Sequence, residues 1–339
     1  ASFKDETTLS SETGSRLRKL KETNTFSYKN PALLKSLLLF GPNGSGKSQL
    51  INALSTMERL VTRPTRTVTD KLPYHPFLFS KDSKHADTVF KVKIELHNKI
   101  YEYSFSYNQD KINYESLILT ENNKKRTIFY RNESGVRTSN KLLEESVPKL
   151  RDNSLFLYLA QSENHPESSE VYKWFAQDLI LLGNGYSLMI PDEYLELMNN
   201  EYLKKEMISF LSFADFNISD IKIREIPNPV YEQIFKLLRH DLVENLNVDS
   251  LKNHKELYTI HKIYDDDEVI DHGELPLSNE SVGTQRLFYI VLAMMLAQIN
   301  GNRKTIVIDE FDDSLHVELA SALVKIFKGK YESIHRHYS

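Results

Sequence analysis

The feature that most constrains the fold is the eight-residue stretch GPNGSGKS, which fits the pattern G-x-x-x-x-G-K-[ST] in full. An apolar run over residues 33–40 precedes it and predicts a buried strand, and apolar spacing over residues 48–60 predicts an amphipathic helix after it. Glycines let the backbone N–H groups curl around an anion, to which the helix N-terminus adds partial positive charge. Strand, loop and helix in this order predict a phosphate-binding loop. Its residues are Gly41, Pro42, Asn43, Gly44, Ser45, Gly46, Lys47 and Ser48.

Two side chains of this loop have expected roles in nucleotide chemistry. Lys47 should reach the β- and γ-phosphates, and the Ser48 hydroxyl should ligate Mg²⁺. The alternative is an accidental glycine-rich turn, and the strand and helix patterns on either side argue against it. We therefore expect ATP and Mg²⁺ to bind here.

A second candidate site follows a short apolar strand, Thr305–Ile308, which ends in Asp309 and Glu310. In a parallel sheet we expect this strand to lie beside the strand that feeds the phosphate loop, so that Asp309 faces the magnesium held by Ser48. Glu310 is then placed to orient or deprotonate the water that attacks the γ-phosphate. The alternative is an acidic cluster at a strand end, because further carboxylates follow closely.

Residues 279–286, NESVGTQR, lie directly before an apolar helix predicted over residues 287–298. The Ser281 hydroxyl and the Gly283 N–H, at a helix N-terminus, would form a second anion-binding point. One chain cannot easily close both anion sites around the same phosphate, whereas two chains packed head to tail can. The alternative is an ordinary helix cap at Ser281.

These motifs resemble those of ABC-type ATPases, in which a Ser-x-Gly signature acts in trans across a nucleotide sandwich. Of the common Leu-Ser-Gly-Gly-Gln form, the chain keeps the serine and one glycine. The long separation of Ser281 from the phosphate loop resembles the SMC/RecF branch. The segments FGPNGSGKS, ESVGTQRL and IDEFDDSLH look like the RloA/AbiL-type ATPases, which are akin to the ATPase parts of OLD nucleases and of the Septu (PtuA) and PARIS (AriA) defence systems.

The resemblance and the hydrophobic periods together predict an α/β fold, an ABC-type P-loop ATPase head with a mixed β-sheet. A period of two over residues 85–130 predicts an inserted antiparallel β-meander, and helical spacing over residues 142–247 predicts a helical lid. Both ends of the chain are expected to be incomplete. The expected parts are residues 1–84 and 273–339 for the two halves of the head, 85–135 for the meander and 136–272 for the helical insertion.

The resemblance also implies a function. It implies an ATPase that dimerises head to tail, or forms a higher oligomer, and regulates an effector in anti-phage defence, most plausibly a nuclease. Lys47 and Glu310 would act in catalysis, with Ser281 and Gly283 supplied in trans. His316 occupies the place of a loop that crosses the dimer interface, and capping of the last helix is an equal alternative for it.

Three other functions stay open at this point. An SMC/RecF-like DNA-repair or DNA-clamp ATPase is the main alternative, and a P-loop kinase or a scaffold with negligible hydrolysis are the others. The net charge of −4 gives no general attraction to nucleic acid. Basic runs at residues 16–19 and 123–126 leave local contact with nucleic acid open, although such runs are usually solvated.

The amino-acid composition excludes several kinds of site and partner. The absence of cysteine excludes disulfides and thiolate metal sites and fits a cytoplasmic location. Residues 287–299, a long apolar stretch, are too few to span a bilayer, so we expect no membrane partner. The histidines show no metal-binding spacing.

Overall fold

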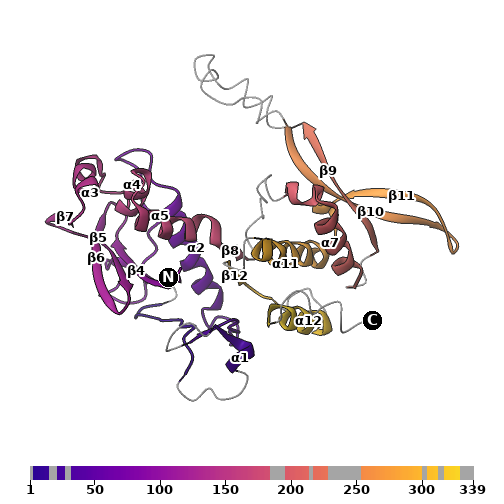
Figure 1. The fold of residues 1–339 in the computed structure, drawn as a ribbon, viewed down its shortest axis with the longest axis horizontal. Helices are drawn as coiled ribbons and strands as arrows, with labels where there is room; N and C mark the ends of the chain where they lie inside the picture. The colour runs from indigo at the N-terminus through magenta and orange to yellow at the C-terminus, as the bar shows by residue number, and fades with distance from the viewer. Residues whose placement is uncertain are drawn as a thin grey trace, which may run out of the picture. The chain divides into compact units, whose positions relative to one another are not determined.

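The structure, a computed structural model, forms two compact units (Figure 1). The first comprises Ala1–Leu181, Lys304–Asp309 and Ile326–Ser339, and the second comprises Leu182–Arg303 and Glu310–Lys325. The boundary therefore falls between the two acidic residues that end the predicted strand. The described residues are 3–14, 21–26, 32–183, 195–213, 217–227, 253–299, 304–311 and 317–328.

An antiparallel meander of five strands dominates the first unit. It confirms the meander predicted from the period of two and extends it by the last strand, which ends at Thr138. The chain turns at residues 108–110, where the side-chain oxygen of Asn108 accepts the N–H groups of Asp110 and Lys111 at 2.9 and 3.1 Å. The strands, in sheet order, are β3 (Thr88–Leu96), β4 (Lys99–Tyr107), β5 (Ile112–Glu121), β6 (Lys124–Asn132) and β7 (Gly135–Thr138).

The alternation in β4 shows why this segment forms a half-buried strand. Every second residue is a fully buried aromatic, while the serines and the glutamate between them lie on the other, less buried face. Successive side chains of a strand point to opposite faces, so one face of β4 belongs to the core. The buried aromatics are Tyr101, Tyr103, Phe105 and Tyr107.

Helices cover the aromatic face of the meander. Val61, Phe156 and Phe175 come from three different helical segments and join one core cluster with the β4 aromatics. Trp174 also lies in this cluster. The helical segments of this unit are α2 (Lys47–Thr62), α3 (Lys141–Ser146), η1 (Val147–Lys149), α4 (Phe156–Ser162), α5 (Pro166–Lys173) and the π-helical turn η2 (Trp174–Asp178).

A buried carboxylate connects the meander to this helical layer. Glu115 of β5 is fully buried and accepts the N–H groups of Phe156 and Leu157, the start of α4, at 2.7 and 2.8 Å. It also accepts the Tyr103 hydroxyl at 3.0 Å, and Arg131 lies 3.8 Å away. The sheet thus caps a helix that is distant in sequence.

The prediction of a strand over residues 33–40 is wrong for residues 35–40. Only β2 (Leu33–Leu34) is a strand, and it pairs with β1 (Thr25–Phe26), which follows the short helix α1 (Lys21–Asn24). Residues 35–40 carry no strand, and Phe40 is 88 % exposed. An apolar run shows that a segment can be buried, but a strand also needs a partner with free backbone groups.

The acidic strand is present as β12 (Thr305–Ile308), but its neighbour differs from the expected one. It pairs with β8 (Leu179–Leu182) in a two-stranded sheet, because no strand exists at residues 35–40 to receive it. Lys304 fixes the start of β12, since its Nζ lies 2.8 Å from the Asp178 carboxylate and donates to the Gln177 carbonyl at 2.7 Å.

The second unit contains a three-stranded antiparallel sheet in the order β11-β10-β9. The segment predicted as a helical insertion, residues 136–272, therefore also contains strands. In β10, Leu257 and Thr259 are buried and lie two residues apart, which is the spacing of side chains on one face of a strand. The strands are β9 (Ile218–Pro227), β10 (Asn253–Asp265) and β11 (Glu268–Pro276).

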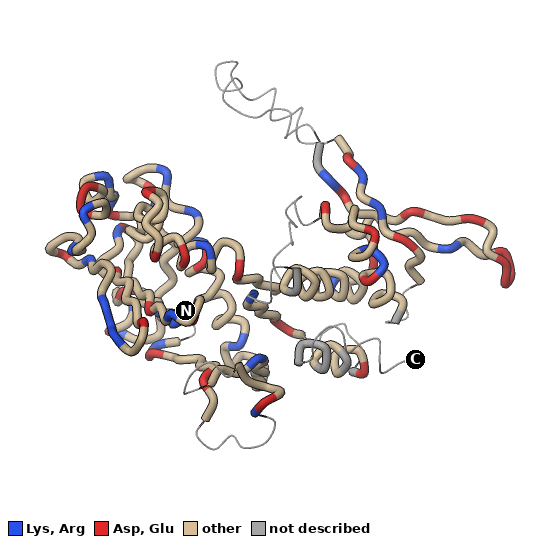
Figure 2. The backbone as a smooth tube through the Cα atoms, viewed as in Figure 1, with Lys and Arg blue, Asp and Glu red and all other residues tan. Residues whose placement is uncertain are grey.

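Beyond Ile218, the N-terminal residue of β9, the sheet continues as a two-stranded ribbon. His261 is the last residue of β10 that pairs with β9, and the rest of β10 pairs with β11 alone. Both strands of this ribbon are exposed, and its turn carries an acidic group that Figure 2 shows at the tip. The group consists of Asp265, Asp266, Asp267 and Glu268.

The apolar helix expected over residues 287–298 is confirmed as α11 (Val282–Ile299), buried along most of its length. It packs against α7 (Glu201–Phe213), which also contacts β9. None of the helices in the described part of the chain is both long and apolar enough to cross a membrane. The other helical segments are η3 (Glu196–Asn199), η4 (Leu277–Asn279) and α12 (Val317–Lys328).

Candidate functional site

The phosphate loop has the predicted position, directly before α2, which begins at Lys47. Gly46 caps this helix with φ 95°, and Gly44 has φ 79°, a left-handed conformation that is costly for residues with a Cβ. Residues 41–45 are exposed, whereas Met57 and Val61 anchor α2 in the core. A rigid helix therefore presents an accessible loop.

Lys47 folds back over this loop. Its Nζ donates to the Gly41 carbonyl at 2.7 Å and to the Pro42 carbonyl at 3.2 Å. Two neutral carbonyls are weak partners for an ammonium compared with a charged oxygen. The first turn of α2 contains no acidic residue, so nothing within it opposes the partial positive charge of the helix N-terminus. The loop is thus arranged to receive an anion.

Ser48 and Asp309 are the predicted ligands of Mg²⁺, and both belong to the first unit. Ser48 lies in the first turn of α2, and Asp309 comes directly after β12. A hydroxyl and a carboxylate are the oxygen ligands that Mg²⁺ prefers, and in phosphate sites it needs few from the protein. Across the residues that the structure describes, no group of three or more His, Asp or Glu could hold a metal.

A contact that the sequence does not indicate lies beside the loop. A Cβ on Gly46 would come within 2.9 Å of the Phe3 ring. The N-terminal segment thus touches the phosphate loop, and the positive φ of Gly46 is the feature that favours glycine at this position. No local pattern could have predicted it, because the two residues are far apart in sequence.

Ser281 lies at the start of α11 in the second unit, and the helix-cap interpretation of it is confirmed. Its Oγ accepts the Thr284 N–H at 3.1 Å and lies 2.7 Å from the Thr284 hydroxyl. When the Thr284 hydroxyl donates, the Ser281 hydroxyl hydrogen stays available for a phosphate. Ser281 is exposed, and the neighbouring Val282 side chain is 67 % exposed. Gly283 follows in the first turn of the helix.

Glu310 has φ 48°, a left-handed conformation that non-glycine residues seldom adopt. Arg286 of α11 donates a hydrogen bond to its backbone carbonyl. The helix that begins at the signature therefore holds the backbone of the predicted catalytic glutamate within the same unit. Arg286 lies in the quoted motif, but its sequence position gave no indication of this contact.

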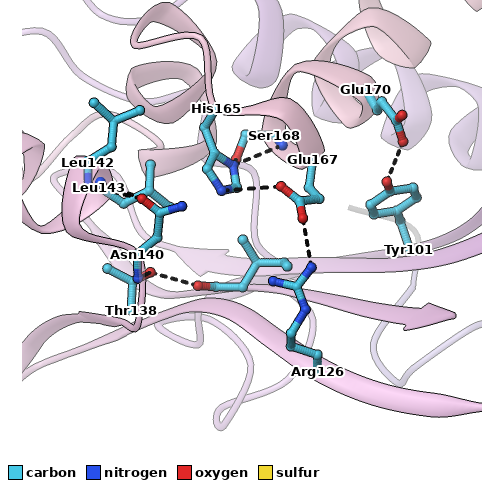
Figure 3. A network of polar contacts seen from close by, with 11 residues as sticks. Tyr101, Arg126, Thr138, Asn140, Leu142, Leu143, His165, Glu167, Ser168 and Glu170 are labelled. Atoms are coloured by element: carbon cyan, nitrogen blue, oxygen red, sulfur yellow. Dashed lines mark hydrogen bonds and ion pairs between the residues drawn. The ribbon is translucent and has the colours of Figure 1, made fainter.

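A polar cluster at the start of α5 contains serine, histidine and glutamate (Figure 3). His165 Nδ1 lies 3.0 Å from the Ser168 Oγ, and its Nε2 lies 3.3 Å from Glu167, which pairs with Arg126 at 2.7 Å. The Ser168 N–H also donates to Nδ1 at 3.3 Å, and both residues are buried. Burial lowers the pKa of His165, which favours the neutral acceptor. The cluster is a helix cap without access for a substrate.

The basic run at residues 123–126 is partly neutralised. Lys125 lies 3.3 Å from the Glu102 carboxylate, and Arg126 pairs with Glu167. These ion pairs give no support to a nucleic-acid contact at this turn. The other basic run, residues 16–19, and the proposed interface residue His316 lie outside the described residues.

Residues 36–336 match the model of a protein family described as "AAA domain, putative AbiEii toxin, Type IV TA system". The match includes the phosphate loop, the signature and the acidic strand. No curated protein matches the chain. The family match supports the predicted class of P-loop ATPase, and the finer assignment to the RloA/AbiL type stays a prediction.

Proposed function

Because the chain belongs to this AAA-domain family of P-loop ATPases, we propose that it hydrolyses ATP at a site completed by a second copy packed head to tail. The observation that carries the proposal is the exposed phosphate loop, in which Lys47 donates to two backbone carbonyls. ATP phosphates would replace these carbonyls as stronger partners.

The first unit supplies the binding half of the site. The loop N–H groups and Lys47 hold the β- and γ-phosphates, and Ser48 and Asp309 hold Mg²⁺. The bound metal neutralises charge that develops on the phosphates during hydrolysis.

Glu310 supplies the basic group. Its carboxylate orients or deprotonates the attacking water, for which a fixed backbone is an advantage because catalytic groups need defined geometry. The left-handed φ of Glu310 and the hydrogen bond from Arg286 provide that fixation.

The second copy supplies Ser281 and Gly283. The exposure of Ser281 and of the Val282 side chain supports this role, since an exposed apolar residue beside a helix N-terminus suits a protein interface. A serine that acts in trans needs no contact with the phosphate loop of its own chain.

The biological role follows from the resemblance and from the toxin named in the family description. We propose that ATP-dependent dimerisation, or assembly into a higher oligomer, regulates an associated nuclease in anti-phage defence. A nuclease gene adjacent to this one, and a nuclease activity that changes with ATP, would support this role.

Steady-state ATP hydrolysis tests the catalytic part. We expect the wild type to hydrolyse ATP, Lys47→Ala to bind ATP more weakly and to lose hydrolysis, and Glu310→Gln to lose hydrolysis while ATP still binds. Mixing Ser281→Arg with Lys47→Ala should restore activity, because one of the two sites in a mixed dimer is intact. Equal hydrolysis by wild type and Glu310→Gln would remove the base from the mechanism, and ATP-dependent, salt-sensitive DNA binding would instead favour a DNA clamp.

A further inference from the structure

Glu280, the residue directly before Ser281, is fixed by two side chains of β10. Its side chain is only 9 % exposed, and its Oε1 lies 2.6 Å from His261 Nε2. The same oxygen accepts a hydrogen bond from the hydroxyl of Thr259. These contacts attach the start of the signature to the three-stranded sheet of the second unit.

The strand geometry explains why β10 presents both side chains. Thr259 and His261 are two residues apart and therefore share a face of the strand, and His261 Nε2 lies 3.2 Å from the Thr259 Oγ1. The pairing with β9 shifts register between Ile260 and His261, and the extra residue Ser219 donates its hydroxyl to the Ile260 carbonyl at 2.9 Å. Such bulges re-aim side chains, and they are frequent beside functional sites.

The backbone of Glu280 is held as well. The Gln285 amide donates to the Glu280 carbonyl at 2.8 Å and to the Ser278 carbonyl at 3.2 Å. The N–H of Glu280 donates to the Leu277 carbonyl at 3.1 Å. The side chain of Glu280 thus connects this segment to the sheet. Because Ser281 is the next residue, the position of the Glu280 backbone determines the position of Ser281.

His261 occupies a distinctive place in this sheet. It is the last residue of β10 paired with β9, so the three-stranded part ends there and the exposed two-stranded ribbon begins. The position of a side chain at this junction depends on both the three-stranded part of the sheet and the two-stranded ribbon. A carboxylate held by a histidine at this point therefore couples the sheet to the signature.

We propose that His261 and Glu280 are positioning residues, which hold Ser281 where it meets the nucleotide bound by a second copy. The proposal rests on the proposed function, because it concerns the half of the site that acts in trans. It predicts that breaking the pair weakens closure of the dimer and leaves the affinity of each phosphate loop for ATP unchanged.

The test uses the Glu310→Gln background, in which ATP is not consumed, and measures dimer affinity by analytical ultracentrifugation at saturating ATP. Adding His261→Ala, which removes the donor, or Glu280→Gln, which keeps the shape but removes the charge of the acceptor, should weaken the dimer by about tenfold. His261→Gln keeps an N–H donor and should retain most of the affinity. His272→Ala, which removes an exposed histidine of β11, is the matched control and should have no effect. ATP affinity, measured with a fluorescent analogue on dilute monomer, should be the same for every variant.

Two outcomes would overturn the inference. One is that His261→Ala and Glu280→Gln dimerise as tightly as the parent. The other is that they lose ATP affinity together with dimerisation. If His261→Ala is unfolded, the nearly isosteric Glu280→Gln decides alone. If the Glu310→Gln parent itself does not dimerise, the proposed function fails, and the inference fails with it.

Discussion

Replacement of Ser281 separates its role as a helix cap from its proposed role in binding phosphate. Its Oγ accepts the Thr284 N–H at 3.1 Å, and Thr284 is 3 % exposed, so this N–H has little access to water as a substitute. Ser281→Ala should therefore lower the free energy of unfolding by about 1 kcal/mol. Ser281→Asp should leave it unchanged, because aspartate is an equally good cap and its charge suits a helix N-terminus.

The two Ser281 replacements should affect ATP-dependent dimerisation in the opposite order. A carboxylate held about 4 Å from a phosphate oxygen repels it by about 4 kcal/mol at an effective dielectric constant near 20. That energy corresponds to roughly a thousandfold weaker dimer. Ser281→Asp should thus be as stable as the wild type and almost inactive, whereas Ser281→Ala should be less stable and less severely impaired.

The assay combines denaturant unfolding followed by circular dichroism with steady-state ATP hydrolysis. Ser134→Asp places the same charge on an exposed turn of the meander and controls for the change in net charge. If Ser281→Asp hydrolyses ATP as fast as this control does, then Ser281 is a cap and nothing more, and the reasoning about the trans site is refuted.

Three further predictions concern binding and stability. Lys47→Ala should bind a fluorescent ATP analogue about 10- to 100-fold more weakly, since a charged hydrogen-bond donor is lost; unchanged affinity would exclude the loop as the phosphate site. Glu115→Ala should lower the free energy of unfolding by about 3–5 kcal/mol, because it removes the carboxylate partner of the buried Arg131, which keeps backbone carbonyls as acceptors, and leaves two buried N–H groups of α4 uncapped; a loss under 1 kcal/mol would show that the network is dispensable. Burial lowers the pKa of His165 below the unfolded value near 6.5, so the unfolded chain binds more protons and stability should fall as pH drops below about 6.5. His165→Asn, which keeps a cap for Ser168, should lose that pH dependence in thermal melts between pH 5.5 and 7.5, and an unaltered slope would assign it to other groups.

Elements whose pattern is local could be predicted from the sequence. The apolar spacing after the glycine-rich loop predicted α2, the period of two over residues 85–130 predicted the meander that contains β4, and the run TIVI predicted β12. Each signal lies within the element itself, because side-chain periods of 3.6 and 2 follow from backbone geometry alone.

Contacts between distant segments could not be predicted. The pairing of β12 with β8 depends on which strands exist elsewhere, and a single apolar run at residues 33–40 suggested the wrong neighbour. The contact of Phe3 with Gly46 and the hydrogen bond of His261 with Glu280 likewise join residues that no short motif connects. The candidate site was therefore predictable as a set of motifs, whereas the residues that support it required the structure.

The central claim is that two copies of the chain enclose ATP between them. The most direct test is the sedimentation mass of Glu310→Gln at saturating ATP and Mg²⁺, with Lys47→Ala in the same background as the control. The account predicts a mass of at least two chains with ATP, one chain with ADP, and one chain for the control under both conditions. A mass of one chain at saturating ATP, with nucleotide demonstrably bound, would contradict it.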